Sequence, residues 1–263
     1  MRIEVRDLLI MLACYEQYFL TLIQIGILFF SDCKDFYDVP LRRINKLMKA
    51  GYLEGVKTRI GEETLYVVTQ KGLLLLKERG LLKGLLHTLK GKVPQYYKHD
   101  LWVTNARVIF TKLLGFDKWT SERVLKREAN KRKVPDGLVS NGETTYVIEV
   151  ELSLKAQRRY YEKTFLDFDR HYPKATAILY LVEDQGMLNW FLKTAKGWPR
   201  IYFAVIESPL DIVHGLFFVN CENKTIELPR VQLGGKIIFN PDDPNRDMMI
   251  EDYWDERQAE LSE

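Results

Sequence analysis

The sequence predicts a mixed fold, α+β as a whole and α/β in its second part, on three observations. The first eighty of the 263 residues show helical periodicity interrupted by one hairpin. Residues 99–240 alternate helical segments with short apolar strands, which is typical of an α/β sheet protein. A basic stretch with Gly84, Gly91 and Pro94 separates the two parts, so residues 81–98 are interpreted as a linker.

The first part is expected to form three helices, a hairpin and a fourth helix. Thr21 is a typical N-cap of the second helix, Pro40 suits the start of the third, and Gly51 suits its end. The predicted helices span residues 7–18, 22–30, 41–50 and 73–78, and the hairpin strands span 56–60 and 64–69 around a turn at 61–63. This order is that of a winged helix-turn-helix domain, predicted over residues 1–80.

The third helix carries the cations expected to contact DNA. Its predicted buried positions recur at helical spacing: Leu41, Ile44, Leu47 and Met48. The cations predicted on its exposed face are Arg42, Arg43, Lys46 and Lys49, and those on one side of the first hairpin strand are Lys57 and Arg59. A cationic helix fits the major groove, so we predict double-stranded DNA as the partner. The alternative is a solvated helix in a protein-interaction module.

The second part is expected to form a helix, an antiparallel strand pair, a helix, a strand, a helix and a strand. The predicted helices span residues 99–114, 154–170 and 186–193, and the buried strands span 175–182 and 201–206. The strand pair is predicted around the turn signal Asn141-Gly142. Residues 215–219 are predicted as an edge strand and 237–240 as a short extension.

Three acidic residues flank this turn. Asp136 stands near the start of the first strand, and Glu149 and Glu151 stand near the end of the second. Because strand side chains alternate, both glutamates are predicted on one face, with Ile148 and Val150 toward the core. Clustered carboxylate oxygens suit Mg²⁺ or Mn²⁺, the cations that support phosphodiester hydrolysis. The pattern therefore predicts a metal site.

Each acidic residue also has a purely structural interpretation. Asp136 after Pro135 suits a turn. Glu149 and Glu151 would face solvent if their strand lay at the edge of the sheet. Glu122, an acidic residue upstream, would be an ordinary residue on a helix surface. The sequence leaves both interpretations open.

Pro135-Asp136 followed by Glu149-Val150-Glu151 resembles the motif of the PD-(D/E)xK nuclease superfamily, which has a restriction-endonuclease-like fold. The resemblance implies that Asp136, Glu149 and Glu122 hold the metal and that Glu151 orients the attacking water. The superfamily usually has lysine where this chain has Glu151, so Lys155 or Lys163 would have to supply the cation. The implied catalytic set is therefore Glu122, Asp136, Glu149, Glu151 and Lys155.

The whole arrangement also resembles the replication-relaxation family of plasmid and conjugative-element proteins. The similarity rests on residues 65–72 after the wing, on the helix from His99 to Arg107, and on the order of Trp119-Thr120-Ser121-Glu122, Pro135-Asp136 and the strand with Glu149. It covers residues 15–170. It implies DNA handling in plasmid or mobile-element replication, mobilisation or regulation, with other replication or mobilisation proteins as partners.

Two functions from different classes agree with these residues. The favoured one is a DNA-binding accessory or regulatory protein, with a homodimer as its expected assembly, whose nuclease-like domain only grips DNA. The other is an active Mg²⁺-dependent DNA endonuclease targeted by the winged helix. The absent lysine argues against hydrolysis. The four acidic residues argue for it, because close carboxylates repel one another unless a cation or a proton intervenes.

The distribution of charge favours a polyanionic partner. Residues 83–133 contain 13 Lys and Arg against 4 Asp and Glu. Residues 242–263 contain 9 Asp and Glu against 2 Arg, which predicts an acidic tail over residues 241–263. Plain surface solubility is the alternative explanation for both segments.

The cysteines and the apolar segments indicate a cytoplasmic protein. Cys14, Cys33 and Cys221 are far apart and show no metal-ligand spacing, so reduced thiols are expected. The apolar run at residues 20–30 is too short to span a bilayer. We therefore expect no membrane partner.

Overall fold

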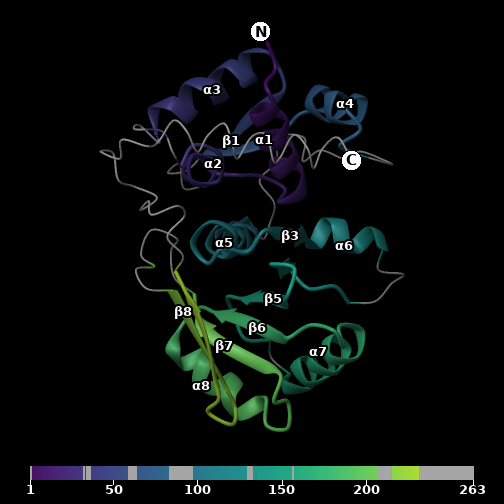
Figure 1. The fold of residues 1–263 in the computed structure, drawn as a ribbon, viewed down its shortest axis with the longest axis vertical. Coiled ribbons are helices and arrows are strands. Elements are labelled where there is room, and N and C mark those ends of the chain that lie inside the picture. Colours follow the sequence, from purple (N-terminus) through teal and green to yellow (C-terminus); the bar gives the residue numbers. More distant parts are fainter. Residues whose placement is uncertain are drawn as a thin grey trace. The chain divides into compact units, whose positions relative to one another are not determined.

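The computed structural model describes residues 2–31, 33, 37–58, 64–82, 97–128, 133–155, 157–206, 212 and 215–230. Contacts divide the chain into two compact units, here called unit 1 and unit 2, described over residues 2–82 and 98–230 (Figure 1). Within these residues the fold is mixed α+β, with eight α-helices and a mixed sheet. None of the described helices has the length and apolar character needed to cross a membrane.

Unit 1 has the predicted order of elements. Helices α1 (Val5–Glu16), α2 (Leu22–Phe29) and α3 (Asp38–Lys49) precede the antiparallel hairpin of β1 (Leu53–Lys57) and β2 (Thr64–Val68), and α4 (Gln70–Glu78) follows. Capping explains where α2 and α4 begin, because the Thr21 and Thr69 hydroxyls accept hydrogen bonds from backbone N–H groups of the first turns.

The hairpin of unit 1 starts earlier than expected. β1 covers Leu53–Lys57 rather than residues 56–60, because the side chains of Leu53 and Val56 are both buried and pair in register with β2. Lys57 therefore ends the strand. Arg59 and the predicted turn at 61–63 lie outside the described residues.

A seven-stranded mixed sheet forms the centre of unit 2. Its strand order is β3-β4-β5-β6-β7-β8-β9; β5, β6 and β7 run parallel, and the other neighbours are antiparallel. Asn141 and Gly142 form the predicted turn between β4 and β5, and Gly142 has a φ of 86°. The strands are β3 (Lys118–Ser121), β4 (Gly137–Ser140), β5 (Thr145–Glu151), β6 (Ala177–Val182), β7 (Ile201–Val205), β8 (Gly215–Asn220) and β9 (Thr225–Pro229).

Helical segments cover both faces of this sheet. On one face, α7 (Arg158–His171) and α8 (Gln185–Thr194) pack against β5, β6 and β7. The aromatic core between them includes Phe165, Tyr180 and Phe203. The other face is covered by α5 (Tyr97–Val108) and the π-helix that continues it (Ile109–Leu113), through ring contacts such as Phe110 with Phe218. The strands with the acidic residues therefore lie between two layers.

Three elements of unit 2 differ from the sequence prediction. Residues 118–121 form β3, so Glu122 is the first residue of α6 (Glu122–Glu128). α7 begins at Arg158 rather than at residue 154, so Lys155 lies in the loop before it. β8 is not an edge strand, because β9 pairs along its outer side. The predicted segments 237–240 and 241–263 lie outside the described residues.

Candidate functional site

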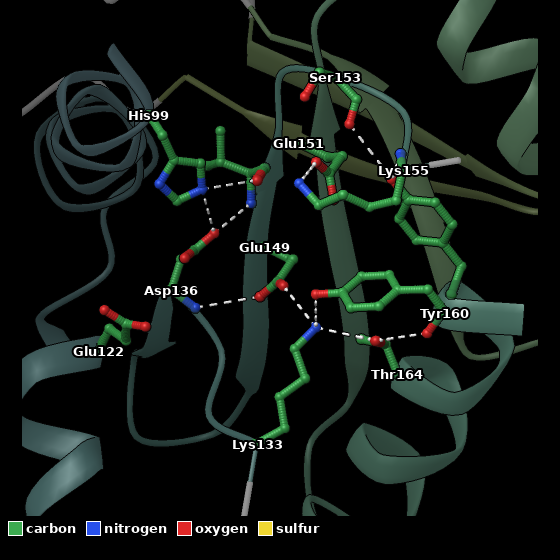
Figure 2. Close-up of polar contacts among 12 residues, drawn as sticks. His99, Glu122, Lys133, Asp136, Glu149, Glu151, Ser153, Lys155, Tyr160 and Thr164 are labelled. Carbon is green, nitrogen blue, oxygen red and sulfur yellow. Dashed lines mark hydrogen bonds and ion pairs between the residues drawn. The ribbon is translucent and has the colours of Figure 1, made fainter. Parts of the chain in front are cut away.

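Three buried carboxylates lie close together where β4 begins and β5 ends (Figure 2). Asp136 immediately precedes β4, and Glu149 and Glu151 lie on β5. Asp136 and Glu149 are each 9% exposed, and Glu151 is 7% exposed. Carboxylates this buried require cations or hydrogen-bond donors around them, and the structure supplies both.

The register of the hairpin brings Asp136 and Glu149 together. Gly137 pairs with the residue before Glu149, so the two acidic residues lie opposite each other at the next position. The Val150 N–H donates to Asp136 Oδ2 at 2.8 Å, and the Asp136 N–H donates to Glu149 Oε2 at 3.3 Å. Gly137 allows β3 to approach, because a Cβ there would lie 2.4 Å from the Trp119 ring. The backbone thus orients both carboxylates.

Glu149 and Glu151 share one face of β5, as strand alternation predicts. Glu149 pairs in register with Tyr180, whose ring belongs to the aromatic core beneath α7. The expectation that only Ile148 and Val150 point into a core was incomplete, because both faces of β5 are covered. The interpretation of the glutamates as solvent-facing residues of an edge strand is wrong, since β5 is an inner strand and both side chains are buried.

Lys133 supplies a cation beside Glu149. Its Nζ lies 3.4 Å from Glu149 Oε1 and donates to the hydroxyls of Thr164 at 3.0 Å and Tyr160 at 3.4 Å. The same Nζ lies 5.0 Å from the ring centroids of Tyr160 and Phe168. Helix α7 therefore positions this lysine, although it belongs to the segment before β4 (Figure 2).

His99 of α5 makes the corresponding contact with Asp136. Its Nε2 lies 3.3 Å from Asp136 Oδ2 and 3.0 Å from the carbonyl oxygen of Val150, and its Nδ1 lies 3.7 Å from Asp100 Oδ1. Burial lowers the pKa of His99, but the hydrogen bonds and charges of Asp100 and Asp136 outweigh burial and raise the pKa to about 11. The imidazole is therefore a cation at neutral pH.

Lys155 contacts the third carboxylate, with its Nζ 3.0 Å from Glu151 Oε1. The Tyr161 hydroxyl accepts a hydrogen bond from the Lys155 N–H at 2.9 Å and donates to the Ser153 carbonyl oxygen at 3.4 Å. The loop between β5 and α7 thus brings Lys155 to the site, where the sequence predicted a helical turn. Lys163 is exposed on α7.

Glu122 does not join the carboxylates through a direct contact. Its Oε1 lies 2.6 Å from Lys126 Nζ within α6, although its backbone N–H donates to the Asp136 carbonyl oxygen at 3.0 Å. Figure 2 shows its side chain beside Asp136. Among the described residues, no three His, Cys, Asp or Glu side chains are gathered as ligands of one metal ion. The structure therefore brings two of the three predicted metal ligands, Asp136 and Glu149, into contact.

The protonation of Glu149 reflects its surroundings. Burial and the neighbouring charge of Asp136 raise the pKa of Glu149 to about 8, although the charge of Lys133 opposes them. Burial lowers the pKa of Lys133, but the charge of Glu149 and the contacts with Tyr160 outweigh burial and raise it. These surroundings therefore favour the protonated form of Glu149, and a cation bound beside it would favour the ionised form.

Asp136 and Glu149 fit the donor set of a hard divalent cation. Mg²⁺ in proteins commonly takes one or two carboxylates and completes its coordination shell with water and phosphate oxygens. Burial and the mutual repulsion of two carboxylates raise the pKa of Glu149, and a divalent cation would offset both effects. Glu122 fits this role less well, because Lys126 already neutralises it.

In unit 1, α3 exposes a row of cations. Its buried positions are Pro40, Ile44 and Leu47, whereas Leu41 and Met48, which were predicted to be buried, are only half-buried. The exposed cations on this helix and at the end of β1 are Arg42, Lys46, Lys49 and Lys57. These side chains form a positively charged surface in the sequence region predicted to contact DNA.

Arg43 is not part of that exposed row, which corrects the sequence prediction. Its guanidinium contacts both carboxylate oxygens of Asp7, and Glu4 Oε1 lies 3.2 Å from Nη2. The Asp7 side chain is 0% exposed and that of Arg43 is 17% exposed. The arginine therefore joins α3 to α1, because the buried Asp7 needs a cationic partner.

His99 and Lys133 are the residues of the carboxylate cluster that the sequence prediction missed. In the sequence, His99 stands out only as part of a family-like helix, and Lys133 only as the last of three successive cations at residues 131–133. Lys133 could have been predicted from its position, because it comes just before Pro135-Asp136 and therefore lies near the start of that strand.

No family model matches this chain, and comparisons with curated proteins and solved structures found no match either.

Proposed function

We propose that the protein binds double-stranded DNA through unit 1, acting as a winged helix-turn-helix domain. The observation that carries this proposal is the surface of α3, where Arg42, Lys46 and Lys49 are exposed while Ile44 and Leu47 anchor the helix. The hairpin that follows carries Lys57 at its exposed end. A helix with this charge can lie in a major groove and contact phosphates along its flanks.

The proposed setting is the replication, mobilisation or regulation of a plasmid or mobile element in the cytoplasm. It follows from the resemblance to the replication-relaxation family. The partners implied are other replication or mobilisation proteins and a second copy of this chain. In this setting unit 2 would be a restriction-endonuclease-like domain and would either grip DNA or cleave it.

The DNA-binding proposal is tested by changing Arg42, Lys46 and Lys49 together to alanine. The slope of log affinity against log salt should fall in this variant, because each phosphate that loses its cation contributes roughly 0.9. Fluorescence anisotropy with a labelled duplex measures both affinity and slope. Lys77→Ala on α4 is the control for loss of one exposed cation. A triple variant with the wild-type slope would remove α3 from the binding surface.

The second candidate function is metal-dependent hydrolysis of DNA by unit 2. The observation that favours it is Lys133, a cation 3.4 Å from Glu149 in a site where the motif lacked its usual lysine. Asp136 and Glu149 would hold Mg²⁺ or Mn²⁺, which would supply charge for the transition state and activate water. Lys133 and Lys155 would neutralise phosphate charge beside the carboxylates, and Glu151 would orient the water. Glu122 would assist from the start of α6.

Hydrolysis is tested with purified protein and supercoiled plasmid in Mg²⁺ or Mn²⁺. We expect nicking that Asp136→Asn abolishes, together with a calorimetric Mn²⁺ site that the same variant loses. The control is Glu227→Gln, which removes an exposed carboxylate of unit 2 on β9. Mn²⁺ binding without nicking would leave DNA binding as the function, and nicking that survives Asp136→Asn would exclude this site.

A further inference from the structure

A pocket of about 270 Å³ is lined by residues of α1 and α3 in unit 1. Its cations are Arg6 of α1 and Arg42 and Lys46 of α3, and its apolar lining comes from Phe30 and Val39. This pocket is separate from the carboxylate cluster of unit 2. Insertion of α3 into the major groove of DNA does not by itself explain this pocket, because Arg6 belongs to α1.

The described lining of the pocket carries more cations than carboxylates, with Arg6, Arg42, Arg43 and Lys46 against Glu4. Glu4 and Arg43 also line it, but Arg43 contacts both Glu4 and the buried Asp7. Those contacts neutralise the fourth cation. Arg6, Arg42 and Lys46 therefore face a space that contains no further lining carboxylate among the described residues. Such a site favours an anion.

The other lining groups favour a phosphate that carries an organic substituent. The Arg6 guanidinium carbon lies 4.6 Å from the centre of the Phe30 ring, so the aromatic face supports the cation. Phe30 and Val39 add apolar surface beside the three cations. A deoxyribose attached to a phosphate presents this combination of an anionic group and an apolar edge.

The geometry of α3 separates the pocket from the rest of the exposed surface. With a turn of roughly 100° per residue, Val39, Arg42, Arg43 and Lys46 fall within one arc of about 100°. Asn45 and Lys49 lie outside this arc, on the side of Arg42 away from Arg43. Both are exposed. One edge of α3 therefore lines the pocket, whereas another exposed edge of the same helix does not.

We infer that this pocket holds one backbone phosphate of bound duplex DNA, with its sugar against Phe30 and Val39. The inference rests on the DNA binding proposed above and assigns different roles to the side chains of α3. Arg42 and Lys46, together with Arg6, contact the DNA backbone. Asn45 and Lys49 are then the side chains directed to base edges, where amide and ammonium groups discriminate sequence.

The test uses the full chain, a labelled duplex and the variants Arg6→Gln, Lys46→Gln and Asn45→Ala, with Lys77→Gln as the charge-matched control. Arg6→Gln and Lys46→Gln should each lower the salt slope by a fraction of the roughly 0.9 that one phosphate contributes, because their side chains share that phosphate, and should weaken binding equally for all duplex sequences. Asn45→Ala should leave the slope unchanged and reduce discrimination between sequences. Arg6→Lys, which keeps the charge, should retain the wild-type slope, and thermal melting confirms that each variant is folded.

Wild-type slopes in folded Arg6→Gln and Lys46→Gln, with duplex binding intact, would overturn the pocket but not the proposed function. If no duplex binds the wild-type protein, the proposed function fails, and NMR titrations with orthophosphate and with a deoxynucleoside monophosphate examine the pocket alone. Shifts near Arg6 and Phe30 without duplex binding would assign the pocket to a free phosphorylated ligand and overturn DNA as the occupant. The absence of shifts would overturn the pocket as an anion site.

Discussion

At the scale of single residues, cationic side chains accompany the two buried carboxyl groups of Asp136 and Glu149. His99 lies against Asp136 and Lys133 against Glu149, so each carboxylate has its own cationic neighbour. The pKa of Glu149 is nevertheless raised to about 8, because burial and the charge of Asp136 exceed the effect of Lys133. The cluster therefore still favours additional positive charge, which a proton or a metal ion can provide.

This raised pKa predicts how stability depends on pH without metal. Between about 4.5 and about 8, Glu149 is ionised in the unfolded chain but protonated in the folded protein. In this range the folded protein binds more protons than the unfolded chain. The contribution of Glu149 to the free energy of unfolding therefore falls as pH rises. The free energy of unfolding of the Glu149→Gln variant, minus that of the wild type, should therefore increase from pH 5 to pH 8. Urea unfolding in EDTA measures this difference.

The control for that experiment is Glu227→Gln, which replaces an exposed carboxylate on β9. His99 also makes stability fall with pH, because its pKa rises from 6.5 to about 11 on folding. That contribution is common to wild type and Glu149→Gln, so it largely cancels in the comparison. A difference independent of pH would contradict the raised pKa of Glu149.

At the scale of elements, the contact between α1 and α3 determines which cations of α3 are exposed. Arg43 lies against the fully buried Asp7, while Arg42, its neighbour in sequence, is exposed and donates from Nε to the Asp38 carbonyl oxygen at 3.4 Å. Two adjacent arginines therefore have different roles. One orients the helix, and the other is available to a ligand.

These roles predict opposite effects of the two substitutions. Arg43→Ala should lower the free energy of unfolding by about 3–5 kcal/mol, because it leaves the buried carboxylate of Asp7 without a cation. Arg42→Ala should change it by less than about 0.5 kcal/mol, as expected at an exposed position, yet weaken DNA binding. Urea unfolding and anisotropy of the same preparations compare them. Equal stability of the two variants would show that Asp7 does not depend on Arg43.

At the scale of the whole molecule, the two proposed activities belong to different units and should be separable. EDTA should abolish nicking and leave duplex affinity unchanged, because α3 and β1 need no metal to contact phosphates. Conversely, the Arg42, Lys46 and Lys49 alanine variant should lose affinity but retain Mn²⁺ binding at Asp136. Anisotropy and calorimetry measure the two properties independently. Loss of Mn²⁺ binding in the α3 variant would contradict separate sites.

Local patterns in the sequence determined the order of elements in unit 1 and part of the carboxylate cluster. The Thr21 cap, the Asn141-Gly142 turn and the common face of Glu149 and Glu151 depend on residues only a few positions apart. Capping, turn geometry and strand alternation act within that range. The sequence patterns predicted the first residues of β1 and α7 wrongly, because burial against neighbouring elements decides where an element starts.

Only the tertiary structure decided which charges meet. Arg43 and Asp7 are 36 residues apart, Lys133 and Thr164 are 31 apart, and His99 and Val150 are 51 apart. No local pattern specifies such pairs, because a lysine or arginine on an amphipathic helix or loop is equally compatible with solvent until the packing around it is known. Burial then makes the pairing necessary, since a carboxylate enclosed by protein requires a cation, a donor or a proton. The sequence alone therefore identified the acidic residues, and the packing of α5, α7 and the segment before β4 selected their partners.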